Sequence, residues 1–323
     1  MKTSPARTCR TILASVLLAL LPVVSAPADP PAACWSAEAL SAKPGEERAR
    51  RVTEWIEPEI VAFAPATPPA PLGPAPSATR GVVRRVCLPD GDRRIALTFD
   101  LCETSREIAG YDGRIVDLLR AEDVRATFFA GGHWMRTHPE RAAQLLADPL
   151  FELGQHGWSH RNLAVLTGDD LRREIDAATV EAARVRSDLL ARPCMAGVAV
   201  PALRYFRYPF GECDDDAQAA LSDAGLTAIQ WDVAPGDPAP GIGAKSIARA
   251  MTDGVRPGSI VVLHANGRGR RTADALAIAI PELRARGYAF ATISELLAAG
   301  EPEIETRCFV SRPGDTLRYR RAR

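Results

Sequence analysis

The sequence has no excess of charge of either sign, because 40 lysines and arginines balance 40 aspartates and glutamates among its 323 residues. Proteins that bind nucleic acid or another anionic polymer usually carry a basic surplus, so we expect no nucleic-acid partner. The composition is not that of a disordered chain, since 46% of residues are hydrophobic and 25% are charged. No internal repeat divides the sequence, and its length suits one large α/β domain or two small ones.

A long apolar run is also missing. Residues 11–24 are mostly apolar, but this run is too short to span a bilayer comfortably. Basic residues precede it, and Ala26-Pro27-Ala28 follows as an A-x-A cleavage site. The pattern predicts a signal peptide at residues 1–28 and an exported mature chain, periplasmic or secreted, without a stable membrane span. A membrane anchor is one alternative, and a lipoprotein acylated at Cys34 is another, although Pro31 stands where an acylation box has Leu.

Cysteine is scarce, and the six residues left after the signal peptide form an even set: Cys34, Cys87, Cys102, Cys194, Cys213 and Cys308. In an oxidising compartment such a set favours disulfides, but six cysteines allow 15 pairings and the sequence does not choose among them. Three of these cysteines (Cys34, Cys87 and Cys308) lie outside the expected enzyme core. We expect them to fasten the terminal segments to it.

The chain divides into four parts by composition. The signal peptide is followed by an N-terminal extension with a Pro/Ala-rich linker at 29–90, a catalytic domain at 91–300 and a C-terminal extension at 301–323. Within the third part, short β-rich runs alternate with helical patterns, which predicts a parallel sheet or barrel. The expected strands are 95–100, 126–130, 151–153, 204–208, 228–231, 259–263 and 289–292. The expected helices are 114–120, 139–146, 169–190, 215–224, 244–253 and 271–286.

Chemically active side chains follow several of these strands. His156 and His160 come after the third strand, and their spacing suggests one face of a helical turn that could hold a metal ion. Asp100, Arg207, Asp237 and His264 stand at or after the ends of four other strands. Because the carboxyl ends of parallel strands meet at one mouth, these groups should converge there. A histidine pair alone is weak evidence, since structural histidines show the same spacing.

The motifs in this order resemble those of the polysaccharide deacetylase family, also called NodB homology or carbohydrate esterase family 4. Leu97-Thr98-Phe99-Asp100 resembles the start of its TFDD motif, and residues 156–160 resemble its H-[ST]-x-x-H motif. Residues 207–211 resemble its R-x-P-Y-G motif, and residues 259–264 its closing L-x-H strand. The resemblance implies an α/β fold, a distorted seven-stranded (β/α) barrel, over about residues 94–297.

The same resemblance implies a role for each motif residue. His156 and His160 would hold Zn²⁺ or another divalent transition metal that polarises the acetyl carbonyl. Asp100 would be the general base, oriented by Arg207, and His264 the general acid, partnered by Asp237. The backbone N–H of Phe210 would bind the oxyanion.

The family's third metal ligand, its second Asp, is replaced here by Leu101. If the strand continues, Leu101 points away and Cys102 returns to the Asp100 side; if the chain turns, Glu103 can swing inward. We expect Glu103 to be the third ligand, with Asp100 and Cys102 as alternatives, because oxygen keeps the metal a stronger Lewis acid and leaves Cys102 free for a disulfide.

The sequence therefore predicts an exported, metal-dependent deacetylase that hydrolyses N-acetyl groups of a glycan to free amine and acetate. Its partner would be an N-acetylated glycan, such as peptidoglycan or another envelope or extracellular polysaccharide. Two alternatives remain: an O-acetyl esterase or non-sugar amide hydrolase on the same fold, and a catalytically impaired glycan-binding protein. Two departures from the family motivate the second alternative: Leu101 replaces its second Asp, and Pro238 replaces the closing Trp of its fourth motif.

Overall fold

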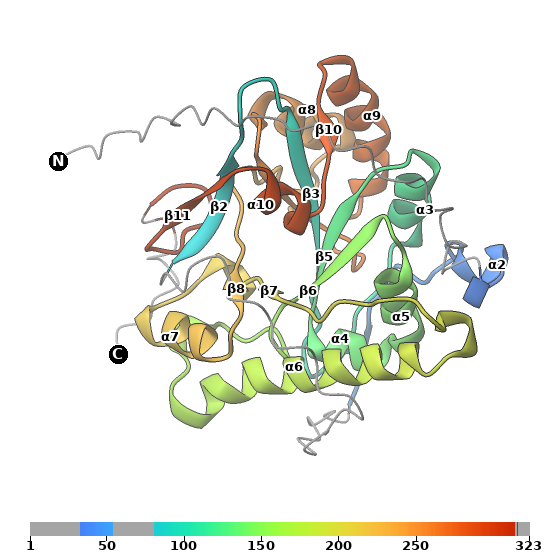
Figure 1. The fold of residues 1–323 in the computed structure, drawn as a ribbon, viewed down its shortest axis with the longest axis vertical. Coiled ribbons are helices and arrows are strands. Elements are labelled where there is room, and N and C mark those ends of the chain that lie inside the picture. The colour runs from blue at the N-terminus through green and yellow to red at the C-terminus, as the bar shows by residue number, and fades with distance from the viewer. Residues whose placement is uncertain (1–32, 54–80, 314, 316–323) are drawn as a thin grey trace.

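The computed structural model describes residues 33–53, 81–313 and 315. The expected signal peptide and most of the Pro/Ala-rich linker lie outside the described residues. A curled parallel sheet forms the centre of the fold (Figure 1). Its strands are β3 (Arg94–Leu101), β5 (Ala126–Ala130), β6 (Phe151–Gln155), β7 (Tyr205–Phe206), β8 (Thr227–Ala228), β9 (Ile260–His264) and β10 (Ala289–Phe290).

All ladders of this sheet are parallel, in the order β10-β3-β5-β6-β7-β8, and β9 pairs with β3. Each of the seven strands expected from the sequence overlaps one of these. The expected closed barrel is formed only in part. Between β8 and β9 the link is a single parallel bridge, Val233 to Val261, where a closed barrel would have a ladder. The segment after β8 contains Pro235, Gly236 and Pro238, which cannot sustain strand pairing.

Helices cover the outside of the sheet (Figure 1). All six expected helices are present: α3 (Gly113–Ala121), α5 (Pro139–Ala147), α6 (Gly168–Leu190), α7 (Asp215–Asp223), α8 (Ala244–Gly254) and α9 (Thr272–Ala285). The longest, α6, buries a stripe that includes Leu171, Ile175, Ala178, Ala182, Val185 and Leu189. This spacing of three and four residues places them on one face, so the helix packs along the domain.

Several short elements escaped the sequence prediction. They are α2 (Ala37–Leu40), α4 (Gly132–Thr137), α10 (Ile293–Ala299) and the 3₁₀ turns Leu163–Val165, Pro193–Met195 and Pro209–Gly211. β1 (Arg50–Arg51) pairs with β4 (Glu107–Ile108) in a small antiparallel ribbon. A second ribbon joins β2 (Val82–Cys87) to β11 (Glu301–Glu305). β2 also contacts Ile229 and Ser259, so part of the expected N-terminal extension packs against the sheet.

Two disulfides tie the ends of the chain to this body. Cys34 is bonded to Cys194, and Cys213 to Cys308; Cys87 is disulfide-bonded as well. The expectation that Cys34 and Cys308 fasten terminal segments is confirmed. Among the described residues, Cys102 is the free cysteine, and it is buried. No helix in the described parts of the chain has the length and apolarity that crossing a membrane requires.

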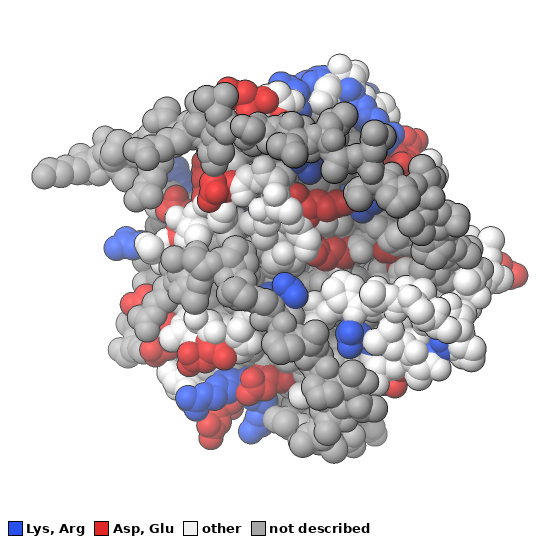
Figure 2. All heavy atoms as spheres, in the orientation of Figure 1, with Lys and Arg blue, Asp and Glu red and all other residues white. Residues whose placement is uncertain are grey.

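Acidic and basic side chains are interspersed on the face shown in Figure 2. Their mixture there agrees with the equal counts of the two signs in the sequence.

Candidate metal-binding and catalytic site

Asp100 and Arg207 form a buried ion pair at the carboxyl ends of β3 and β7. Nη1 of Arg207 donates to Oδ1 of Asp100 at 2.8 Å. The guanidinium also donates to the carbonyls of Ile229 and Gln230, both at 3.2 Å, and lies 4.0 Å above the ring centroid of Phe129. All three nitrogens of this guanidinium therefore donate a hydrogen bond, which fixes its orientation. Burial lowers the pKa of Arg207, and the Asp100 carboxylate opposes that shift.

His156 and His160 lie in a loop after β6, so the expected helical turn is wrong. Gly157 has a φ of +72° and His160 a φ of +56°, and these left-handed residues break any helix. Glu174 of α6 holds the loop in place by accepting hydrogen bonds from Ser159, at 2.9 Å from its N–H and 2.6 Å from its hydroxyl. In the motif that this loop resembles, a Ser or Thr follows the first histidine, whereas this chain has Gly157. The Glu174 carboxylate supports the loop two residues further on, at Ser159.

One ring nitrogen of His156 is hydrogen-bonded and the other is not. Nδ1 lies 2.8 Å from the main-chain carbonyl oxygen of Arg207, so Nδ1 carries the proton and donates it. Burial opposes a charge on this imidazole, but Asp100 and Cys102 outweigh it and raise the pKa of His156, so Nε2 offers a lone pair in the neutral form of the ring. It is buried and has no hydrogen-bond partner among the described residues, although the imidazole is only 1% exposed. A buried acceptor without a donor is costly unless something binds it.

The thiol of Cys102 stands among the other groups. The ligand atoms of Cys102, His156 and His160 lie within 4.8 Å of one another, and so do those of Asp100, Cys102 and His264. Cys102 is thus common to both groups. Burial works against its ionisation, but His160 and His156 outweigh it and bring the pKa of the thiol well below its ordinary value.

Glu103 is not brought to the histidine pair. Its side chain is fully buried on the other side of the loop, where it accepts hydrogen bonds from the Ala109 N–H at 2.7 Å and the Thr137 hydroxyl at 2.8 Å. Its carboxylate also lies 2.6 Å from Nδ1 of His133. The expectation that Glu103 is the third metal ligand does not fit this geometry, because β3 continues through Leu101 and the side chains alternate along it.

The structure brings His264 and Asp237 together, as the sequence led us to expect. Oδ1 of Asp237 lies 3.0 Å from Nδ1 of His264, and Oδ2 accepts from the His264 N–H at 2.8 Å and the Thr272 hydroxyl at 2.7 Å. Burial opposes the charge on His264, but the Asp237 carboxylate overcomes it and raises the pKa of His264 well above its ordinary value. The Asp237 carboxylate therefore favours the protonated form of this imidazole.

Phe210 borders the histidine loop. Its ring centroid lies 4.5 Å from that of His160, and the side chain is 47% exposed. The residue has a φ of +62°, and the following Gly211 has a φ of +68°. A Cβ on Gly211 would lie 2.9 Å from the Trp231 ring, so only glycine permits this turn of the chain beside the site.

These groups fit a transition-metal site. Catalytic zinc is commonly held by three protein ligands drawn from His, carboxylate and Cys, with one position left open. The unpaired Nε2 of His156, whose other nitrogen is fixed by a carbonyl, is what such a site requires of a histidine ligand. His160 and Cys102 lie close enough to join it. The alternation of side chains after Asp100 is the sequence signal that pointed to Cys102.

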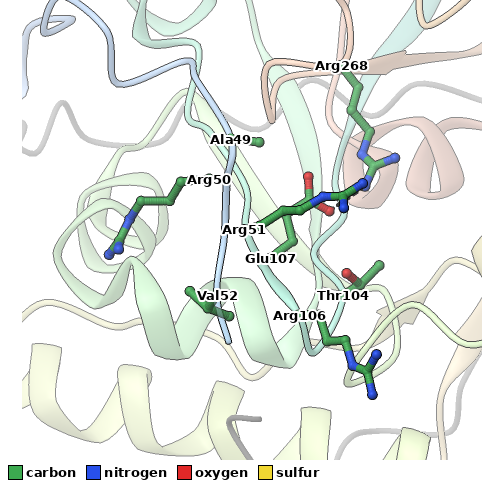
Figure 3. A pocket seen from close by; sticks show the side chains of 8 residues that line it. All are labelled: Ala49, Arg50, Arg51, Val52, Thr104, Arg106, Glu107 and Arg268. Carbon is green, nitrogen blue, oxygen red and sulfur yellow. Dashed lines mark hydrogen bonds and ion pairs between the residues drawn. The ribbon is translucent and has the colours of Figure 1, made fainter. Parts of the chain in front are cut away.

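A pocket lies beside the site. It has a volume of about 670 Å³ and is lined by Ala49, Arg50, Arg51, Val52, Thr104, Arg106, Glu107 and Arg268 (Figure 3). Its Thr104 belongs to the loop that carries Cys102, and its Arg268 to the segment that follows His264. Asn266 links these two segments by donating to the Cys102 carbonyl at 2.7 Å. Four arginines against one glutamate make the pocket basic.

Comparison with known proteins gives consistent matches. A family model described as polysaccharide deacetylase matches residues 88–229. A peptidoglycan-N-acetylglucosamine deacetylase from Bacillus cereus is 31% identical over 215 residues, which cover 65% of this chain and 91% of that protein. The crystal structure of a family 4 acetyl xylan esterase from Clostridium thermocellum in complex with a cobalt ion has a TM-score of 0.51 at 26% identity, and the match covers 64% of this chain and 91% of that one.

A further similar structure is a CE4 family pseudoenzyme from Bacillus anthracis, with a TM-score of 0.56 at 23% identity over 70% of this chain and 72% of that one. At this identity the similarity shows the fold alone.

Proposed function

The chain belongs to the polysaccharide deacetylase family, and from that premise we propose that it is an exported, metal-dependent enzyme that removes N-acetyl groups from peptidoglycan. The products would be acetate and a free amine on the glycan. The observation that carries this proposal is the convergence of an ion-paired carboxylate, a histidine pair with an unpaired nitrogen, and a second, carboxylate-bound histidine.

His156 and His160 would hold the metal, which supplies Lewis-acid polarisation of the acetyl carbonyl. Asp100 accepts the proton of the attacking water. Its Oδ1 is occupied by Arg207, so Oδ2 is the basic oxygen, and this atom lies 3.7 Å from Nε2 of His156. Arg207 fixes the direction of the carboxylate through this contact.

His264 donates a proton to the departing amine. An amide does not cleave productively unless its nitrogen is protonated as it leaves, so this residue decides whether the tetrahedral intermediate goes forward. Asp237 holds the imidazole by Nδ1, which turns Nε2 toward Cys102 and Asp100. The Phe210 N–H is the proposed donor to the oxyanion.

The basic pocket supports peptidoglycan over a neutral glycan. Peptidoglycan carries carboxylates on its stem peptides, and on the lactyl group of any muramic acid without a peptide, whereas chitooligosaccharide and xylan backbones do not. Arginine binds carboxylates with two parallel hydrogen bonds. Of the four pocket arginines, Arg106 lies on the segment after Cys102, and Arg268, which is paired with Glu107 at 2.8 Å, lies on the segment after His264. The overall neutrality of the chain conceals this local surplus of positive charge.

Export is supported by the disulfides. Cys34–Cys194 and Cys213–Cys308 are structural bonds of a kind that persists in oxidising compartments and is rare in the cytosol. Peptidoglycan lies in such a compartment. The expected signal peptide at residues 1–28 would deliver the chain there.

The test is acetate release by the purified, metal-loaded chain from four substrates: peptidoglycan, peptidoglycan stripped of its peptides, chitooligosaccharide and acetylxylan. We expect release from intact peptidoglycan that Asp100→Asn abolishes. Release from acetylxylan alone would establish the esterase alternative. Binding to insoluble glycan without acetate from any substrate would establish the glycan-binding alternative.

Arg51→Gln and Arg268→Gln should raise KM for intact peptidoglycan and leave KM for chitooligosaccharide unchanged. Equal changes in KM for both substrates would show that the pocket does not bind the carboxylates of peptidoglycan.

A further inference from the structure

We propose that Cys102 is the third protein ligand of the metal, so that a thiolate and two imidazoles form a Cys-His-His site where the family has Asp-His-His. The inference rests on the proposed function. It places a cysteine among the metal ligands, where the family's Asp-His-His site has no cysteine. It also predicts which metals the site takes.

The strand places this thiol. β3 runs through Leu101 with alternating side chains, so Asp100 and Cys102 face the site while Leu101 packs into the main hydrophobic core. Leu101 occupies the sequence position of the missing Asp, but its side chain points the wrong way. The nearest side chain able to replace that ligand is therefore the next one along the chain.

The backbone around Cys102 is fixed on every side. The carbonyl of Asp100 accepts from the Ala265 N–H at 3.2 Å, and that of Leu101 from the Gly131 N–H at 3.1 Å. The carbonyl of Cys102 accepts from the Asn266 amide at 2.7 Å. Three consecutive carbonyls are thus held by two neighbouring segments. A metal ligand needs this kind of rigid support, because a loosely held ligand loses affinity.

The loop after β6 supplies a second ligand atom, on His156. Nε2 of His156 is buried and has no hydrogen-bond partner among the described residues, and the ligand atoms of His156, Cys102 and His160 lie within 4.8 Å of one another. Tetrahedral zinc bonds imply ligand separations of about 3.4 to 3.6 Å. Small side-chain adjustments would close the remaining gap.

The two rival ligands are engaged elsewhere. Glu103 is buried on the far side of the loop among Ala109, Thr137 and His133. Asp100 has one oxygen on Arg207, and the other is needed as the base. Among the free groups of the site, only Cys102 is left to join the two imidazoles.

The oxidation states of the cysteines also support Cys102 as a metal ligand. Five described cysteines are disulfide-bonded, namely Cys87 and the pairs Cys34–Cys194 and Cys213–Cys308, while Cys102 remains a thiol in the same chain. A bound metal would protect it from oxidation. Thiolate ligation is compatible with hydrolysis, since zinc deaminases activate water on a metal held by His and Cys. Thiolate also favours Zn²⁺ and Co²⁺ over Mg²⁺, Ca²⁺ and Mn²⁺.

The test uses the full chain, stripped of metal by chelation and reloaded with Co²⁺. A thiolate ligand gives a sulfur-to-cobalt charge-transfer band in the near ultraviolet, which nitrogen and oxygen ligands do not give. We expect one cobalt per chain with this band in the wild type. Cys102→Ala should lose the band and weaken metal affinity by at least about 10- to 100-fold, the cost of losing even a supporting group. Cys102→Asp should rebind cobalt without the band.

Glu103→Gln is the matched control, because it changes the neighbouring acidic residue and should keep both the band and the affinity. Circular dichroism of each metal-free variant checks folding. Stoichiometric cobalt in the wild type without the band overturns the thiolate ligand, whatever the variants do, and leaves the proposed deacetylase standing. The band without acetate release from any glycan leaves the ligand assignment intact and overturns the proposed function.

Discussion

The carbonyl oxygen of Arg207 lies 2.8 Å from Nδ1 of His156, while the guanidinium of the same residue lies 2.8 Å from Asp100. One residue therefore orients a proposed metal ligand through its main chain and the proposed base through its side chain. These two duties can be separated by mutation, because a substitution removes the side chain and keeps the carbonyl.

Arg207→Met should abolish most turnover and leave metal binding nearly intact. It should also destabilise the fold by about 3 to 5 kcal/mol, because it leaves the Asp100 carboxylate buried without its partner. Metal analysis, acetate release and urea unfolding measure the three effects. Loss of the metal together with turnover would show that the guanidinium, and not the carbonyl, supports the metal site.

Glu174→Gln should weaken metal binding without touching any ligand. Its carboxylate holds the Ser159 N–H and hydroxyl, so the amide would lose one of these acceptor contacts and loosen the loop between the two histidines. We expect about 10- to 100-fold weaker affinity, with activity recovered at excess metal. The control is Glu181→Gln on the same helix. That residue is equally buried but pairs with Arg136 and Arg184, so it should lower stability without changing metal affinity.

His264→Ala should lower turnover by roughly 10² to 10⁴-fold, the usual cost of losing a general acid, while stoichiometric metal remains. The proposed role is proton donation, and no ligand would be removed. Acetate release and metal content are measured on the same preparation. If the variant comes out without metal, His264 belongs to the coordination shell through the Asp100–Cys102–His264 group.

Asp237→Asn should move the alkaline limb of the rate profile to lower pH. A general acid must be protonated, and the raised pKa of His264 extends its protonated range upward. Removing the carboxylate removes the cause of that rise. The sign for stability is the same: the ion pair stabilises the fold fully below the unfolded-state pKa of about 6.5, and this contribution disappears as pH rises through the folded-state value. An unchanged alkaline limb in kcat would assign it to a group other than His264.

The sequence predicted the strands and the main helices well because both patterns are local. Each strand of the sheet is a short apolar run, and α6 has a regular apolar stripe. It failed where the structure depends on partners distant in sequence. The ribbon of β2 and β11 is of that kind. So is α4, which is too short to show a period and is set by the carbonyls of Gly157 and Trp158 that accept from Gly132 and His133.

The site shows the same limit at the scale of one residue. The order of the motifs identified Asp100, Arg207, Asp237 and His264, and the structure brings these into two ion pairs. The third ligand depended on whether the chain turned after Asp100. The sequence after Asp100 could not decide whether the chain turns. Its path is set by hydrogen bonds that Gly131, Ala265 and Asn266 donate to three carbonyls at the end of β3.

The β2–β11 ribbon imposes an order on synthesis. β2 is made early, but its antiparallel partner at residues 301–305 is made roughly two hundred residues later. A chain still emerging from the ribosome therefore exposes one edge of β2, and such unpaired edges are prone to aberrant pairing with other chains. The β2–β11 ribbon can therefore form only after residues 301–305 have left the ribosome, and until then β2 lacks its antiparallel partner.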